Sequence, residues 1–344
     1  MLNSSKDYIG QYKKIVKCQT KLNIKGTSGG FITTVLIMLL RNKLIDGAIL
    51  VDSKGMHCFP RIAKTEEDIA KCAGSKYQKI SVLSVLKKLD KKKKYALVAL
   101  PCHIRQLEKI SSELIRPIYF RIGLFCGFNL EKKTVGCLAH CLGIEFNNID
   151  QVCFRGGKFP GGFTIKTSNG HTISLPKSFY TLVNKMFIPE KCLCCDDLTA
   201  EYADLSVGDA WEETAFSRVI LRNDRALNVL QVAKDVLLIK NSGFDDIIET
   251  QWHLLQYKKH GVEIRKKYFG QKYKVKMGNY EKLISYYYLG EILFFKKFRA
   301  HILKLNIHQL LTLNKWLRKF DMFLGKWNKK AFSHLQPKGS IVEK

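Results

Sequence analysis

Residues 189–211, PEKCLCCDDLTAEYADLSVGDAW, decide how the rest of the chain is interpreted. This stretch holds three thiols within four residues, Cys192, Cys194 and Cys195. Adjacent cysteines cannot form a disulfide with each other without severe strain, because the bond needs Cα atoms about 5.5 Å apart with converging Cβ vectors. Thiolates at this density suit a soft metal ion or an iron–sulfur cluster. Since the Cys-x-x-Cys pair supplies only two ligands, two more are expected elsewhere.

Length and composition favour a folded protein with reduced thiols. The chain has 344 residues, of which 46% are hydrophobic, so a packed core and two domains are expected. Its 11 cysteines are an odd number, and the polar start MLNSSKDYIGQYKK lacks the apolar segment of a secretory signal. We therefore expect a cytoplasmic protein that uses thiols for metal or redox chemistry. No stretch reaches the roughly 20 apolar residues that a bilayer-spanning helix needs.

Positive charge is concentrated toward the C-terminus. The net charge is +28, and residues 258–344 hold 21 Lys and Arg against 5 Asp and Glu, a net +16. Such a surface suits anionic partners, including acidic lipid headgroups, nucleic acid, phosphorylated cofactors and acidic proteins. We expect a catalytic domain over residues 1–240 and a basic helical extension over residues 241–344.

Hydrophobic patterning predicts an α/β (α+β) fold. Short apolar runs alternate with helical patterns, which indicates a mixed sheet flanked by helices. An inserted antiparallel hairpin is expected over residues 161–175, around the turn Asn169-Gly170. Trp211 is expected in the core, and Asp209 in a turn where it binds local backbone donors.

Two predicted strands each end in a cysteine. The buried-type strands at residues 95–100 and 117–125 are followed by Cys102 and Cys126. If the strands are parallel, both thiols lie at the carboxyl edge of the sheet, where function gathers in α/β folds.

The candidate ligand set is thus Cys102, Cys126, Cys192 and Cys195, which together match the four thiolates of a 4Fe-4S cube. A structural zinc ion uses the same ligands, and reduced cysteines without metal are a third interpretation. Cys194 is either a spare thiol or a replacement for a neighbour.

A glycine-rich turn precedes a predicted helix over residues 31–42. Backbone N–H groups at a helix N-terminus bind phosphate, but this turn is not a full G-x-G-x-x-G motif, and a plain helix entry also explains it. His103, His140 and His171 are candidates for proton transfer, although no partner for them is evident from sequence.

Five segments in order resemble one known family. They are GTSGGFITTVLIMLL from residue 26, AGSKYQ from 73, ALVALPCHIRQLEKI from 96, IGLFCG from 122 and EKCLCCDDLTAEYADLSVGDAW from 190. Together they resemble the beta subunits of coenzyme F-420 (F420) hydrogenase and dehydrogenase, over about residues 8–235. The resemblance implies an oxidoreductase that moves electrons between a 4Fe-4S cluster and FAD, and on to a deazaflavin such as F420 or another organic acceptor. Some bacterial relatives occur with polysaccharide-synthesis genes.

The resemblance also implies roles for individual residues. The cluster ligands would be the four cysteines of the candidate set. The flavin or its phosphates would lie against Thr27, Ser28, Gly29 and Gly30, and against Ser75, Lys76 and Tyr77. Lys76 would hold anionic charge near the pyrophosphate or the reduced flavin.

This chain departs from the family pattern at several points. Many relatives begin with a ferredoxin-like domain, which the sequence lacks, so either the electron donor is a separate protein such as a ferredoxin or the chain is a reduced version of the family. Pro-Cys-Gln is replaced by Pro-Cys-His, which makes His103 the candidate catalytic residue at the substrate side. Glu212-Glu213 follows Trp211 where the family has glycine.

The basic extension leaves a second function open. A non-catalytic, metal-stapled module could use it to bind anionic lipid or RNA, as an accessory of polysaccharide synthesis. For the enzyme, the same extension would dock an acidic electron-transfer partner or the inner membrane face. No specific nucleic acid is expected for it, and the sequence does not fix the oligomeric state.

Overall fold

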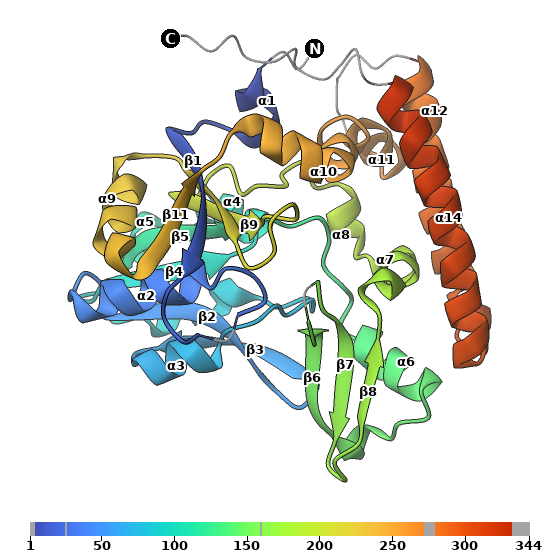
Figure 1. The fold of residues 1–344 in the computed structure, drawn as a ribbon, viewed down its shortest axis with the longest axis horizontal. Coiled ribbons are helices and arrows are strands. Elements are labelled where there is room, and N and C mark those ends of the chain that lie inside the picture. The colour runs from blue at the N-terminus through green and yellow to red at the C-terminus, as the bar shows by residue number, and fades with distance from the viewer. Residues whose placement is uncertain (1–3, 25, 159, 272–278, 332–344) are drawn as a thin grey trace.

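The structure, a computed structural model, describes residues 4–24, 26–158, 160–271 and 279–331. Its centre is an eight-stranded mixed sheet with the strand order β11-β1-β10-β9-β5-β4-β2-β3 (Figure 1). A second sheet, of order β6-β7-β8, is antiparallel. The predicted mixed sheet with flanking helices is therefore confirmed.

The strands are β1 (Lys14–Thr20), β2 (Gly47–Lys54), β3 (His57–Ala63), β4 (Tyr95–Ala99), β5 (Ile118–Leu124), β6 (Ile149–Gly156), β7 (Gly162–Thr167), β8 (Thr172–Leu175), β9 (Leu205–Asp209), β10 (Ser217–Leu221) and β11 (Leu237–Asn241). The α-helices are α1 (Ser5–Ile9), α2 (Phe31–Arg41), α3 (Glu66–Lys71), α4 (Pro101–Leu107), α5 (Ser112–Ile115), α6 (Thr134–Cys141), α7 (Tyr180–Phe187), α8 (Glu190–Leu193), α9 (Asp224–Ala233), α10 (Phe244–Lys259), α11 (Val262–Tyr268), α12 (Asn279–Lys297), α13 (Arg299–Ile302) and α14 (Ile307–Ala331). Short 3-10 helices are η1 (Val82–Lys88), η2 (Phe146–Asn148), η3 (Lys177–Phe179) and η4 (Lys234–Val236).

Both faces of the central sheet are covered. On β4, Ala96 and Val98 join the core around α2 and α9, whereas Tyr95, Leu97 and Ala99 join the core around η1 and α4. This follows from the period of two along a strand. The middle strands β2, β4, β5 and β9 are parallel, as expected for strands that read as continuous apolar runs.

The inserted hairpin is part of a larger unit than predicted. Strands β7 and β8 pair as expected, with Phe163 opposite Leu175, and β6 adds a third strand. Strands β3 and β11 were also not anticipated, because both are edge strands with many half-buried or exposed residues. Before β4, residues 82–88 form a 3-10 helix, η1.

The C-terminal helices lie along one side of the molecule. Helices α12 and α14 run beside α7, and α10 and α11 lie above the cysteine segment (Figure 1). Within the described ranges, no helix combines the length and apolar character needed to cross a membrane.

Candidate cofactor site

The four candidate cysteines come from three separate places in the fold. Cys102 lies in the first turn of α4, directly after β4, and Cys126 lies directly after β5. Because β4 and β5 are parallel, both thiols emerge at the same edge of the sheet, as predicted. The backbone N–H of Cys126 donates to the Leu198 carbonyl over 2.8 Å, which joins the end of β5 to the segment after Cys195.

Ion pairs and hydrogen bonds hold the α8 segment against α4 and α11. The Arg105 guanidinium on α4 lies 2.6 Å from the Asp196 carboxylate, and Lys266 of α11 lies 3.0 Å from it. Burial opposes ionisation of Asp196, but these two cations outweigh it and hold its pKa at about 2. Arg265 donates through Nε to the Leu193 carbonyl over 2.6 Å. The loop with Cys192 and Cys195 is therefore fixed from two sides.

The four thiols interact electrostatically. Burial, together with smaller effects of charge on Cys195 and Cys192, raises the pKa of the Cys102 thiol to about 11. Burial likewise raises the pKa of the Cys126 thiol well above its usual range, with smaller contributions from the other three sulfurs. Such mutual effects need short separations, because charge interactions decay with distance. The structure thus brings together residues that span about a hundred positions of sequence.

Lys258, on α10, points its ammonium into this group of sulfurs. It is 1% exposed, donates a hydrogen bond to the Cys195 sulfur, and lies 5.8 Å from the centroid of the Phe128 ring. Burial lowers the pKa of Lys258, but the thiols of Cys195, Cys126 and Cys192 outweigh this effect and raise it. A buried ammonium requires nearby negative charge, and among the described residues no carboxylate forms an ion pair with Lys258. In the sequence, nothing distinguishes Lys258 from the many other lysines of the chain.

The thiols do not surround a single point. Among the described residues, no group of three or more His, Cys, Asp or Glu side chains is arranged to hold one metal ion. A 4Fe-4S cube is larger than one ion, and each thiolate binds a different iron, so its ligands stand further apart than those of zinc. In chemical type, the donor set of four thiolates is the one that a 4Fe-4S cube uses. Cys194 lies near the cations Arg265 and Lys266, which favour its thiolate, and it also interacts with Cys195.

His103 lies beside Cys102 with its imidazole half-buried. One ring nitrogen donates to the Ile80 carbonyl, and Nδ1 is buried without a hydrogen-bond partner among the described residues. Burial lowers the pKa of His103, so the ring is neutral near pH 7. His140 and His171 are exposed and distant in the fold, on α6 and at the start of β8.

The two predicted flavin segments are adjacent. The Thr27 and Ser75 hydroxyls are 3.1 Å apart, and the Ser28 hydroxyl lies 2.9 Å from that of Ser217 on β10. Gly30 adopts a left-handed conformation (φ 69°) at the N-cap of α2. A Cβ on Gly29 would lie 2.3 Å from the Cys18 carbonyl oxygen, so this glycine permits close packing of the turn against β1.

Lys76 and Tyr77 differ in what they contact. The Lys76 ammonium donates to the carbonyls of Cys72 and Ala73, at 2.5 and 3.0 Å, and so closes the end of α3. Tyr77 packs edge-on against Tyr180, with centroids 5.6 Å apart, and hydrogen-bonds Ser75. Tyr77 thus contacts Ser75, which lies beside the glycine turn. The Lys76 ammonium is instead bound by backbone carbonyls.

Two further cations at this site were missed by sequence reasoning. Arg155, on β6, binds both carboxylate oxygens of Asp209 at 2.9 and 2.7 Å and lies 5.7 Å from the Trp211 ring. Lys177 lies over the rings of Tyr77 and Tyr180, at 4.9 and 4.7 Å. Burial, followed by the charge of Arg155, lowers the pKa of Lys177 to about 8.

The surroundings of Arg155 correct two expectations. Asp209 ends β9 and pairs with Arg155 instead of binding only its own turn. Trp211 is 38% exposed and therefore lies outside the core, because its ring covers the guanidinium at the sheet edge. Neither contact was visible in the sequence, since the inserted sheet supplies Arg155 from more than fifty positions away.

One short segment links the two regions. Ser75 contacts the glycine turn, whereas Ile80 accepts the hydrogen bond from His103, next to Cys102. Between them, the Gln78 carbonyl accepts from the Asn129 amide over 3.1 Å. Five residues of extended chain span at most about 18 Å. The glycine turn and the cysteines therefore lie close together in the fold.

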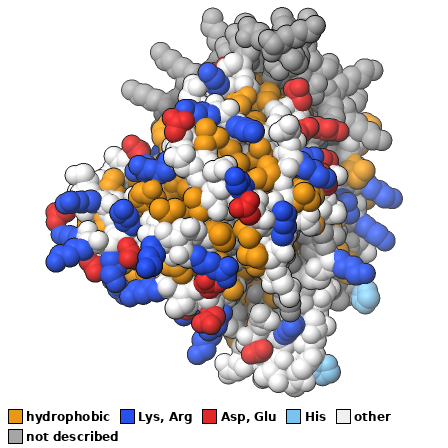
Figure 2. Space-filling view, turned by 60° about the vertical axis from the view of Figure 1, so that its left-hand side comes forward, with side chains coloured by type: hydrophobic (Ala, Val, Ile, Leu, Met, Phe, Trp, Pro, Cys, Tyr) orange, Lys and Arg blue, Asp and Glu red, His pale blue; other side chains and the backbone are white. Residues whose placement is uncertain are grey.

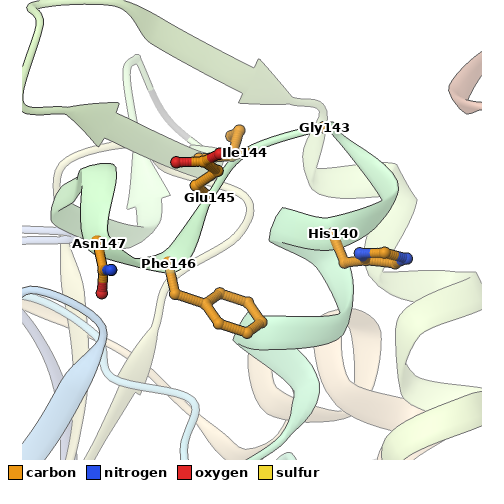
Figure 3. Close-up of a pocket in the computed structure, with 6 residues that line it drawn as sticks. All are labelled: His140, Gly143, Ile144, Glu145, Phe146 and Asn147. Carbon is orange, nitrogen blue, oxygen red and sulfur yellow. The ribbon is translucent and has the colours of Figure 1, made fainter.

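A hollow elsewhere has no part in this site. It measures about 550 Å³ at the end of α6 and is lined by His140, Gly143, Ile144, Glu145, Phe146 and Asn147 (Figure 3). The His140 ring points away from Glu145 and Asn147 in this view. None of the cysteine or flavin candidates lines it.

Comparison with known families agrees with the resemblance in the sequence. Residues 16–87 match the N-terminal part, and residues 92–246 the C-terminal part, of the coenzyme F420 hydrogenase/dehydrogenase beta subunit. The chain belongs to this family of oxidoreductase subunits.

Individual relatives and one solved structure show how far the similarity extends. An uncharacterised protein of Methanocaldococcus jannaschii is 28% identical over 74% of this chain and 95% of its own length. The coenzyme F420 hydrogenase subunit beta of Methanococcus voltae is 25% identical over 69% of this chain and 87% of its own. A chain in a structure of the F420-reducing NiFe hydrogenase complex from Methanosarcina barkeri shares the fold, with a TM-score of 0.63 at 22% identity, over 80% of this chain and 99% of that one.

Proposed function

We propose that this protein is an iron–sulfur flavoprotein that passes electrons between a 4Fe-4S cluster and FAD, and on to F420 or another organic acceptor. Cys102, Cys126, Cys192 and Cys195 would hold the cluster. The glycine turn of residues 27–30, together with Ser75 and Tyr77, would contact the flavin. A separate protein such as a ferredoxin would supply the electrons.

The convergence of four thiols around Lys258 supports this proposal most directly. A lysine that is 1% exposed is costly unless negative charge lies beside it. Four thiolates around an iron–sulfur core provide that charge permanently, whereas four neutral thiols do not. The buried cation therefore favours a site built for a charged cluster over one built for reduced cysteines.

Bound together, the two cofactors would supply one-electron and hydride chemistry, and the chain's own residues position and screen them. Lys258 places a positive charge at the cysteines, where it stabilises added negative charge. His103 would stay neutral and hold Ile80, which orients the segment between the two regions. Tyr77 and Tyr180 exclude water from the space beside the glycine turn.

Lys177 and Arg155 are the cations that we assign to the flavin. A half-buried ammonium over two aromatic rings is arranged to receive an anion, such as a phosphate or a reduced flavin ring. Asp209 fixes the guanidinium of Arg155 in place. Lys76 stays a predicted contact, although its ammonium is engaged by the carbonyls that end α3.

Cofactor analysis of the full chain, purified without oxygen, tests the proposal. We expect a yellow-brown protein with flavin absorbance and about four irons per chain. Addition of reduced F420 should bleach the flavin band. A colourless protein with one zinc ion would contradict the proposal and favour a metal-stapled module. If iron and flavin are bound but reduced F420 has no effect, the protein is still an iron–sulfur flavoprotein, and its acceptor is another compound.

A further inference from the structure

Helices α12 and α14 form an antiparallel pair whose inner side is fixed to the body of the protein. Lys185 of α7 forms ion pairs with Glu291 of α12 and with Asp321 of α14, the latter at 3.1 Å. The rings of Tyr287 and Phe320 meet across the two helices, with centroids 5.8 Å apart. The orientation of the pair, and therefore of its outer side, is thus defined.

The outer side of this pair exposes large apolar side chains. Trp316 is 65% exposed, Phe323 60% and Phe294 55%. Two pairs of these rings are in contact: Trp316 stacks on Phe320 with an interplanar angle of 2°, and Phe294 lies 4.7 Å from Phe298 between centroids. Exposed aromatic rings in contact with one another indicate an interaction surface, unlike single exposed residues.

Exposed cations outnumber acids in this part of the chain, and the described acids of the two helices are paired with Lys185. The exposed cations are Lys282, Lys297, Lys304, Lys315, Arg318 and Lys319. Among the described side chains of α12 and α14, the acids are Glu291 and Asp321, and both pair with Lys185. By contrast, Lys and Arg lie among Asp and Glu over the face seen in Figure 2. Among the described side chains of the two helices, this positive charge is therefore not balanced by unpaired acids.

This combination favours a lipid surface over other anionic partners. Trp and Phe rings enter the headgroup region of a bilayer, while Lys and Arg along the same helix attract anionic lipids at about 1 kcal/mol each. Helix α14 has 25 residues, which is long enough to lie flat across several headgroups. Single-stranded nucleic acid is instead typically bound in a positively charged groove with aromatic stacking platforms.

We propose that the outer side of α12 and α14 docks on an anionic membrane surface. The aromatic rings of Phe294, Trp316 and Phe323 enter the headgroup layer, and the surrounding lysines bind acidic headgroups. The inference is independent of the cofactors, since no residue of the cysteine or flavin site takes part.

Vesicle co-sedimentation of the full chain tests the inference. We expect binding to vesicles of mixed phosphatidylglycerol and phosphatidylcholine, and at least tenfold weaker binding to phosphatidylcholine alone. The double substitution Trp316→Ala and Phe323→Ala should weaken binding at least tenfold. Lys315→Glu with Lys319→Glu should remove the preference for anionic vesicles.

A matched charge control separates a specific surface from net charge. Lys92→Glu with Lys93→Glu makes the same change at an exposed turn before β4 and should leave binding within about twofold. Equal losses in both charge variants would overturn the inference, as would no binding to anionic vesicles. The alternative partner of this surface is a second copy of the chain, and light scattering tests for it. If Trp316→Ala with Phe323→Ala converts a dimer to a monomer and leaves vesicle binding unchanged, the surface joins two copies of the chain and the inference is wrong.

Discussion

The cysteine region and the flavin region are built in different ways. The cysteines follow directly from β4, β5 and α8, and ion pairs between neighbouring elements hold them. The flavin region joins a turn before α2 to cations on the inserted sheet and on η3, far away in sequence. A site whose residues end regular elements can be recognised in a sequence, whereas one completed by an insertion cannot.

The largest expected effect concerns the cluster ligands. Cys102→Ser should lose most of the bound iron, because a cube with three thiolates is poorly held. Serine is close to cysteine in size and shape, so this substitution should leave the fold intact. Cys137→Ser, on α6 and packed against the core of the small sheet, is the matched control and should keep its iron. Equal iron loss in both variants, measured by metal analysis, would show that the ligand set is wrong.

The flavin region should respond to loss of one cation. Lys177→Met should weaken FAD binding about 10- to 100-fold, the range expected for a lost charge-assisted hydrogen bond. Titration of the flavin-free protein, followed by flavin fluorescence, gives the affinity. Lys166→Met, exposed on β7 of the same sheet, should have no effect. If both variants bind FAD normally, the anion lies elsewhere.

The charge of the buried Lys258 should affect the redox potential of the proposed cluster. Lys258→Met keeps the length of the side chain and removes its charge, so the reduced cluster loses a stabilising cation. We expect the midpoint potential of the cluster to become more negative by on the order of 60 mV. This shift corresponds to a tenfold change in the equilibrium constant of a one-electron reduction. A redox titration followed by electron paramagnetic resonance measures this value. An unchanged potential with full iron content would place the cluster away from Lys258.

The pH dependence of FAD binding tests the role of Lys177 in the flavin region separately. Lys177 has a pKa lowered to about 8, so it is cationic below that pH and neutral above it. FAD affinity should therefore fall about fivefold as pH rises from 7 to 9. In Lys177→Met the same titration should be nearly flat. A similar fall in both proteins would assign the pH dependence to another group.

The smallest effect concerns the contact that holds the cysteine loop. Arg105→Ala removes the ion pair between α4 and Asp196. Because Arg105 is partly exposed, the free energy of unfolding should fall by at most about 1 kcal/mol. Iron should nevertheless leave the protein faster when a chelator is added. Gln106→Ala, the exposed neighbour on α4, is the control for both measurements.

The sequence by itself determined the fold class, the family and the cysteines that meet at one edge of the sheet. It could do so because buried parallel strands are continuous apolar runs, and Cys102 and Cys126 stand where two of them end. The glycine turn and Ser75 were also recognisable, as parts of short local motifs.

Only the tertiary structure decided which charges face these motifs. Lys258, Lys177 and Arg155 are ordinary basic residues in a chain of net charge +28, and no local pattern distinguishes them. Their roles depend on burial and on partners far away in sequence, which local propensity does not encode. Folding places Lys258 among thiols and Lys177 over aromatic rings, and this environment gives each cation its chemistry.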